Sequence, residues 1–181
     1  MSLIESIKEL VIKGWKFWNE ENRLCYDAPL GESTSEVLAQ LKQHKASIIR
    51  LLHEKPDIFN IYSLSHGQKA LWFIWQLKPE SAAYNQVSSL HIYDSLDIEK
   101  MRLAISKLLK RHPQLRSTFP KLSGQPIQQI HQNIQIDWKQ IDAHSWDETE
   151  IHTRVLAESK CPFDLENEPG FRFRIFTTAQ H

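Results

Sequence analysis

The sequence is poor in cysteine and glycine and carries no excess charge of either sign. The two cysteines among its 181 residues, Cys25 and Cys161, lie too far apart to predict a disulfide framework. Basic and acidic residues number 22 each, which argues against nucleic acid or an anionic membrane as a partner. Charges interrupt every long apolar run, so we expect no membrane span. Glu5 interrupts the N-terminal apolar stretch, which argues against a signal peptide. We therefore expect a cytoplasmic protein.

The sequence also lacks the residue patterns that are typical of common enzyme active sites. The nine histidines include no pair at i, i+4 beside a carboxylate, and the cysteines form no ligand pair, so no metal site is expected. Five scattered glycines form no phosphate-binding loop. Ser65 is explained as a helix cap rather than as a nucleophile beside His66. His112 follows Arg111 at a helix end and is interpreted as part of that terminus, not as a base. No residue is predicted to be catalytic.

Residues 1–55 have the pattern of a small αββαα module. Ser2 and Glu5 have the spacing of a capping box, and Gly14 can supply the left-handed residue that ends the first helix. The pattern then predicts strands at 15–18 and 23–27 around a turn at 19–22, followed by two helices between Thr34 and Lys55. So small a core leaves room for stabilisation by a homodimer or by a partner chain.

The predicted hairpin is the candidate binding feature of this module. An isolated strand pair has two free edges, and a free edge invites pairing with another chain. If the apolar residues face the helices, the outer face carries Lys16, Trp18, Arg23, Cys25 and Asp27. A basic and aromatic face beside an open edge fits an extended peptide that adds a strand. The alternative is that Lys16 and Arg23 only solubilise the edge and that Trp18 packs on a neighbour.

After a linker at residues 56–62, helices and strands alternate through residues 63–181. This order predicts an α/β sandwich layer. The expected helices are 65–77, 96–111 and 148–159, and the expected strands are 86–93, 115–119, 127–132, 134–141 and 171–177.

Five stretches resemble known families. SLSHGQKALWFIWQLKPESAAYN (63–85), RHPQLRSTF (111–119) and CPFDLENEPGFRFRIF (161–176) resemble three motifs of nonribosomal peptide synthetase condensation domains, in the family order. GWKFWNEENRLCYDAP, together with VLAQLKQHKASIIRLL, resembles the TubC-type N-terminal docking domain. The implied fold is α+β: an αββαα docking domain plus the N-terminal lobe of a chloramphenicol acetyltransferase-like condensation domain.

The resemblance also identifies a missing part. Condensation domains carry a His-His-x-x-x-Asp-Gly signature whose second histidine assists the reaction, and residues 1–181 contain no such segment. The lobe is therefore expected to be incomplete, cut before that signature, and inactive on its own. In the family pattern Arg116 pairs with the signature aspartate, so Arg116 and His112 are interpreted as structural support of an absent active site. Without that aspartate, Arg116→Ala is expected to cost little stability.

The resemblance implies a function for the parent protein. The docking domain is expected to bind the C-terminal tail of an upstream synthetase subunit, and the parent to form an amide between a carrier-bound thioester donor and an aminoacyl acceptor. No cofactor is expected to bind directly; phosphopantetheine belongs to the partner carrier proteins. Two alternatives stay open: the lobe of a coenzyme A-dependent acyltransferase, and a pure interaction adaptor. Residues 1–55 contain eight basic and eight acidic residues, which indicates a tail of mixed charge.

Overall fold

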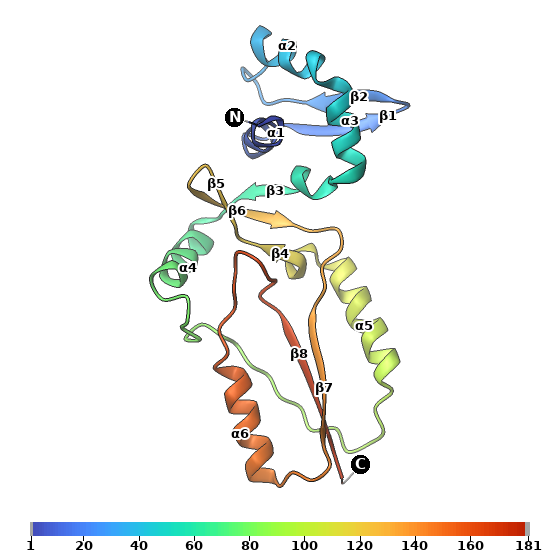
Figure 1. Cartoon of the computed structure of the whole chain (residues 1–181), viewed down its shortest axis with the longest axis vertical. Coiled ribbons are helices and arrows are strands. Elements are labelled where there is room, and N and C mark those ends of the chain that lie inside the picture. The colour runs from blue at the N-terminus through green and yellow to red at the C-terminus, as the bar shows by residue number, and fades with distance from the viewer. Residues whose placement is uncertain (1, 180–181) are drawn as a thin grey trace.

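The computed structural model describes residues 2–179, and it confirms an α+β architecture (Figure 1). The N-terminal part, called the docking unit below, comprises α1 (Leu3–Ile12), β1 (Lys16–Glu20), β2 (Arg23–Asp27), α2 (Ser35–Gln43) and α3 (Lys45–Glu54). The remainder, called the lobe, comprises η1 (Pro56–Phe59), β3 (Ile61–Ser63), α4 (His66–Leu77), α5 (Ile98–Arg111), η2 (Pro113–Arg116), β4 (Ser117–Thr118), β5 (Lys121–Leu122), β6 (Gln125–Ile130), β7 (Asp137–Ala143), α6 (Glu148–Ser159) and β8 (Arg172–Thr178).

Local signals fix the ends of the first helix. The Ser2 hydroxyl accepts the Glu5 N–H while the Glu5 carboxylate accepts the Ser2 N–H, which completes the predicted capping box. Gly14 has a φ of 100°, a conformation that L side chains rarely adopt, and a Cβ there would lie 3.2 Å from Pro29. The chain therefore leaves α1 sharply and enters the hairpin. Trp15, which is only 1% exposed, lies at the centre of the core that α1, β1 and α3 enclose.

The first sheet of the lobe is antiparallel. Strand β6 pairs with β3, β4 and β5, so it joins segments that lie far apart in the chain. Beside this sheet, helix α4 begins at a second capping box, in which Ser65 and Gln68 exchange hydrogen bonds. That bond pattern confirms the interpretation of Ser65 as a cap.

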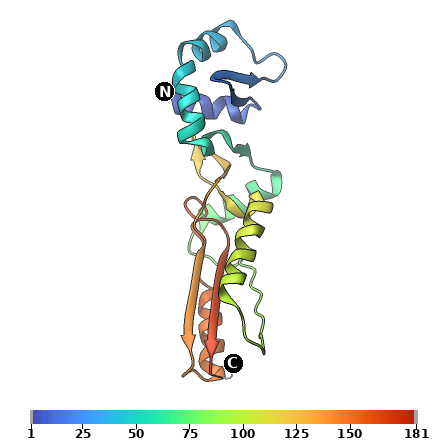
Figure 2. The ribbon, with the colours of Figure 1, turned by 90° about the vertical axis from the view of Figure 1, so that its right-hand side faces the viewer.

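The second sheet is a parallel pair, β7 and β8, and α6 makes the crossover between them. Figure 2 shows this pair at the end of an elongated chain, far from the docking unit. Arg174 on β8 binds Asp137 at 2.5 Å and Glu158 on α6 at 2.8 Å. The hydrogen bond from Arg174 lowers the pKa of Asp137 despite partial burial. This ion cluster ties the crossover helix to both strands.

One strand prediction is wrong and another is correct only in part. Residues 86–93 form no strand among the described residues, and Leu90 in this segment is 90% exposed. Their alternating pattern supplies one apolar side, but a strand also needs a neighbouring strand to pair with. The strand predicted at 115–119 is shorter than expected: Leu115 and Arg116 lie in the turn η2, whose first residue, Pro113, has a φ suited to a turn, and Ser117 and Thr118 form β4 and pair with β6.

None of the helices within residues 2–179 is long and apolar enough to cross a membrane.

Candidate functional site

The docking-unit hairpin turns in two residues. Glu21 and Asn22 have φ values of 46° and 64°, as a type I′ turn requires, and Glu20 faces Arg23 across the strands. The sequence predicted a four-residue turn, so it missed Asn19 and Glu20 as strand residues. The asparagine at position 22 is a local signal for this turn, because asparagine tolerates the left-handed region that a positive φ requires. Within residues 2–179 this sheet has two strands only.

The inner face of the hairpin is fixed by aromatic packing and by α3. Trp15 stacks on Phe17 with ring centroids 6.0 Å apart, and it lies 5.5 Å from the Tyr26 ring. The Asn19 side chain and the His53 imidazole on α3 are in hydrogen-bond contact at 3.0 Å. Tyr26 nevertheless keeps 42% of its surface exposed. Because the inner face is held this firmly, the outer face has a defined orientation.

All five residues predicted for the outer face lie on it. The register sets Lys16 opposite Asp27, and Trp18 opposite Cys25. Trp18 is 45% exposed, and the three charged residues among the five are exposed as well. The face thus combines one large apolar ring with charges of both signs.

Cys25 differs from the other outer residues because it is half-buried. Its thiol donates to the Glu20 carboxylate at 3.6 Å. Desolvation and this bond to Glu20 raise the pKa of the Cys25 thiol. A raised pKa lowers the thiolate fraction at neutral pH, and the thiolate is the nucleophilic form of cysteine.

The register also decides which backbone groups point outward from β2. Residues that flank a two-residue turn exchange both hydrogen bonds, and the bonded pairs then alternate along the ladder. Arg23, Cys25 and Asp27 therefore direct their N–H and C=O groups toward β1. Leu24 and Tyr26 direct theirs to the outer edge. A proline at Cys25 would accordingly break the hairpin itself rather than a bond to an added strand.

The three condensation-type motifs of the sequence meet around α4. Trp72 donates its indole N–H to the Phe119 carbonyl at 3.0 Å, and Trp75 donates to the Phe163 carbonyl at 2.9 Å. Asn85 donates to the Cys161 carbonyl at 2.9 Å. Two tryptophans and one asparagine of the first motif therefore donate hydrogen bonds to backbone carbonyls of the second and third motifs. This explains why residues with side-chain N–H donors occupy these positions.

Arg116 has backbone partners in place of the signature aspartate, and these contacts favour a larger stability cost for Arg116→Ala than the resemblance predicts. Its Nε donates to the Leu109 carbonyl at 2.9 Å. Its Nη1 donates to the Gln132 carbonyl at 3.0 Å and also to the His131 carbonyl. The guanidinium fork thus joins the end of α5 to the segment after β6 through backbone acceptors.

His112 lies at the end of α5, where its backbone N–H donates to the Leu108 carbonyl at 2.9 Å. A second histidine, His131, was missed by the sequence analysis although it occupies a more constrained position. Its Nε2 lies 2.8 Å from the Thr118 hydroxyl, and its Nδ1 lies 3.2 Å from the Asp57 carboxylate. These partners are 13 and 74 residues away in the chain, so no local pattern signals the contact.

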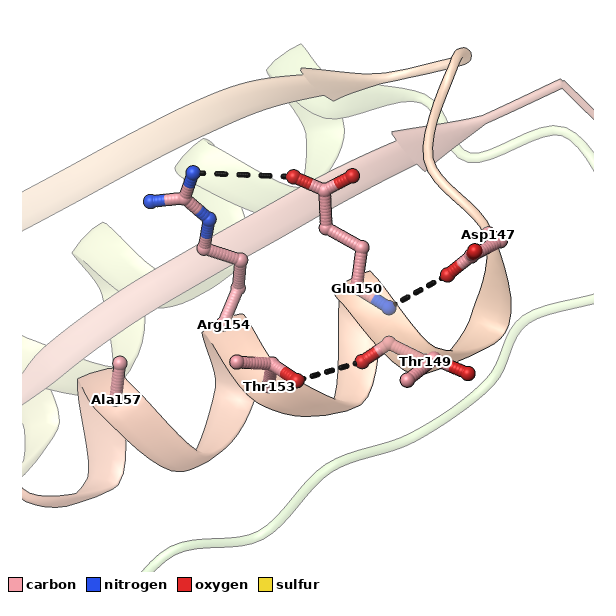
Figure 3. A pocket seen from close by; sticks show the side chains of 6 residues that line it. All are labelled: Asp147, Thr149, Glu150, Thr153, Arg154 and Ala157. Atoms are coloured by element: carbon pink, nitrogen blue, oxygen red, sulfur yellow. Dashed lines mark hydrogen bonds and ion pairs between the residues drawn. The ribbon is translucent and has the colours of Figure 1, made fainter.

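A shallow hollow lies on the surface of α6 (Figure 3). Asp147 caps the helix by accepting the Glu150 N–H at 2.7 Å, and Glu150 pairs with Arg154 at 3.8 Å. Thr153 donates to the Thr149 carbonyl at 2.8 Å. Because these polar groups are engaged within the helix, they do not converge on a common point as a ligand site requires.

Comparisons with known proteins agree with this arrangement. The model of the TubC N-terminal docking domain matches residues 3–54, and the model of the condensation domain matches residues 58–181. One of the proteins that form the linear gramicidin synthase of Brevibacillus parabrevis is 31% identical over 166 residues, which are 87% of this chain and 2% of that protein. Bacitracin synthase 2 of Bacillus licheniformis is 26% identical over 187 residues, 97% of this chain and 7% of that protein. The chain thus spans a small part of the relatives it matches.

Solved structures show the same fold. A four-domain nonribosomal peptide synthetase bound to AMP and glycine matches 65% of this chain and 9% of its own, with a TM-score of 0.59 and 24% identity. The first condensation domain of the calcium-dependent antibiotic synthetase, in complex with a substrate analogue, matches 66% of this chain and 31% of its own, with a TM-score of 0.55 and 21% identity. With a family model covering residues 58–181 and a docking-domain model covering residues 3–54, this chain belongs to the condensation-domain family of nonribosomal peptide synthetases and begins with a TubC-type docking domain.

Proposed function

We propose that the docking unit binds the C-terminal tail of an upstream synthetase subunit, which adds a strand to the outer edge of β2. The observation that supports this proposal is the register, which leaves the N–H and C=O groups of Leu24 and Tyr26 directed away from β1. An incoming strand can use these groups as a ladder. The firmly packed inner face keeps the ladder preformed, which lowers the entropic cost of binding.

Side chains on the outer face select the tail. Lys16 and Arg23 favour acidic tail residues, while Trp18 offers an exposed ring for an apolar one. Asp27 lies opposite Lys16, and Glu20 opposite Arg23, so each basic residue already faces an acidic one. The best tail therefore carries mixed charge. A short tail that orders on binding loses conformational entropy, so its dissociation constant is expected to be on the order of micromolar.

The lobe belongs, in this proposal, to a domain that joins two carrier-bound groups. The acceptor amine attacks the donor thioester carbonyl, a C–N bond forms, the C–S bond breaks, and the donor carrier's phosphopantetheine thiol leaves while the amine loses its proton. Within residues 1–181, Arg116 and His112 support the loop geometry around this chemistry and do not react. The family match to a condensation domain supports this assignment.

The experiment is a scan of backbone methylation along synthetic C-terminal peptides of the upstream subunit. In an added strand alternate N–H groups point toward β2, so methylation at every second residue should abolish binding, and methylation between them should not. Arg23→Glu should weaken an acidic tail, and Lys42→Glu, an equal charge change on the exposed side of α2, should not. If methylation changed the affinity equally at odd and even positions of the peptide, strand addition would be refuted.

A further inference from the structure

The first segment of the lobe shares a core with the docking unit. Residues 56–62, expected as a linker, contain η1 and the start of β3. Ile58 and Ile61 are buried, and they belong to the same cluster as Ile7 and Trp15 of the docking unit. Ile127 on β6 completes this cluster from the lobe. A flexible linker would instead be polar and expose its side chains.

The distribution of buried side chains favours a single folding unit. Ten of the fourteen buried apolar residues between positions 2 and 179 lie in this one cluster. The buried apolar residues of β3 and β6, Ile61 and Ile127, both face the docking unit rather than another part of the lobe. Helix α1 packs against β3 and η1. The β3–β6 sheet therefore obtains much of its buried area from the docking unit.

A hydrogen bond and an aromatic contact also cross this boundary. Within the lobe, the Asp57 carboxylate holds η1 in place: it accepts the Gln132 N–H at 2.8 Å through Oδ1 and contacts the His131 imidazole through Oδ2. Ser123 in the lobe donates to Glu9 on α1 at 3.2 Å. Phe17 of the hairpin meets the Phe59 ring edge-on, with centroids 6.0 Å apart. The Ser123–Glu9 and Phe17–Phe59 contacts each require one relative orientation of the two parts, so together they oppose rotation about the boundary.

From this boundary we infer that the docking unit and the lobe form one cooperative folding unit, with α1 as the cover of the β3–β6 sheet. The interaction surface consists of Ile7 and Val11 on α1 with Ile58, Ile61 and Ile127 opposite. The hairpin edge is consequently held at a fixed orientation to the lobe instead of swinging on a tether. This inference concerns the boundary alone and does not depend on what the hairpin binds.

Native-state hydrogen exchange of the whole chain tests the inference. Ile48 is 0% exposed within α3, on the docking side of the boundary. Ile48→Val should raise exchange rates roughly 2–12-fold in α1, and by the same factor in β3 and β6, because all three open in one event. Ile48→Ala should extend the effect to about 30-fold or more, if that variant folds. Lys42→Ala, an exposed change in the same unit, should leave all three elements unchanged.

Faster exchange confined to α1–α3, with β3 and β6 unchanged, would overturn the inference. Two separate thermal transitions of the whole chain, assigned by amide signals to the docking unit and to β6, would overturn it as well. Peptide titration of the same variants separates the two proposals. If exchange rises by the same factor in α1, β3 and β6 but the tail does not bind, only the docking function is rejected. If the tail binds but exchange rises by different factors in the two parts, only the single folding unit is rejected.

Discussion

Arg116 offers a sharp test because its side chain bridges two segments that lie apart in the chain. It donates from Nε to the Leu109 carbonyl and from Nη1 to the Gln132 and His131 carbonyls. Arg116→Ala removes all these bonds and leaves a carbonyl at the end of α5 without its donor. The variant should therefore be folded but clearly less stable.

The magnitude follows from the bond types. A hydrogen bond from a charged donor contributes about 1.5–3 kcal/mol, and partial exposure of Arg116 favours the lower end for each bond. Counting the two bonds of ordinary length gives a loss of about 3 kcal/mol. In a chain of this size, 1 kcal/mol shifts the melting temperature by about 2–4 °C, so the expected drop is about 6–12 °C. Urea unfolding followed by circular dichroism measures the free energy directly.

Two further variants serve as controls. Arg116→Lys keeps the charge but not the planar fork, so it should recover part of the loss. Arg111→Ala changes an exposed arginine at the end of α5 and should alter stability by less than about 0.5 kcal/mol. If Arg116→Ala were as harmless as Arg111→Ala, the backbone contacts would not hold in solution and the bridging role of Arg116 would be wrong.

Three more outcomes are expected. The hydrogen bond from Arg174 lowers the pKa of Asp137, so this pair stabilises the fold at pH values above 3.8, the ordinary pKa of the carboxyl. That contribution to stability is lost as the pH falls through the lowered pKa. Asp137→Asn removes this dependence, so the free energy of unfolding in acid-urea titrations should fall less steeply in that pH range. Trp72→Phe should cost about 1 kcal/mol in the same assay, because it deletes the bond to the Phe119 carbonyl and keeps most of the ring; an unchanged midpoint would contradict that role. Residues 1–181, supplied with loaded donor and acceptor carriers, should form no amide above the uncatalysed rate, and product that disappears in His112→Ala would contradict this assignment.

Local chemistry explains what the sequence could predict. The capping boxes at Ser2 and Ser65 involve residues that are close in the chain, and the cap at each serine was predicted correctly. The helix at 148–159 was also correct, since its apolar period and its start after Asp147 are local signals. The outward face of the hairpin followed from alternation alone once two strands were recognised.

The errors concern partners that lie far away in the chain. Residues 86–93 alternate well, yet a strand forms only where another strand is in reach. The sequence analysis expected Arg116 to find a substitute for its carboxylate partner but could not name it, because the acceptors are backbone carbonyls, which no side-chain pattern encodes. The contact of Asp57 with His131 spans 74 residues, so no local pattern in the sequence encodes it.

Amide chemical shifts of the whole chain, recorded while the C-terminal peptide of the upstream subunit is added, test the docking function most directly. Strand addition predicts the largest shifts at Leu24 and Tyr26, whose N–H groups point outward, with smaller ones at Trp18 and Cys25. Exchange protection should rise at Leu24 and Tyr26 but not between them. Shifts that gather on residues 47–52 of α3 and leave residues 23–27 unchanged would contradict strand addition.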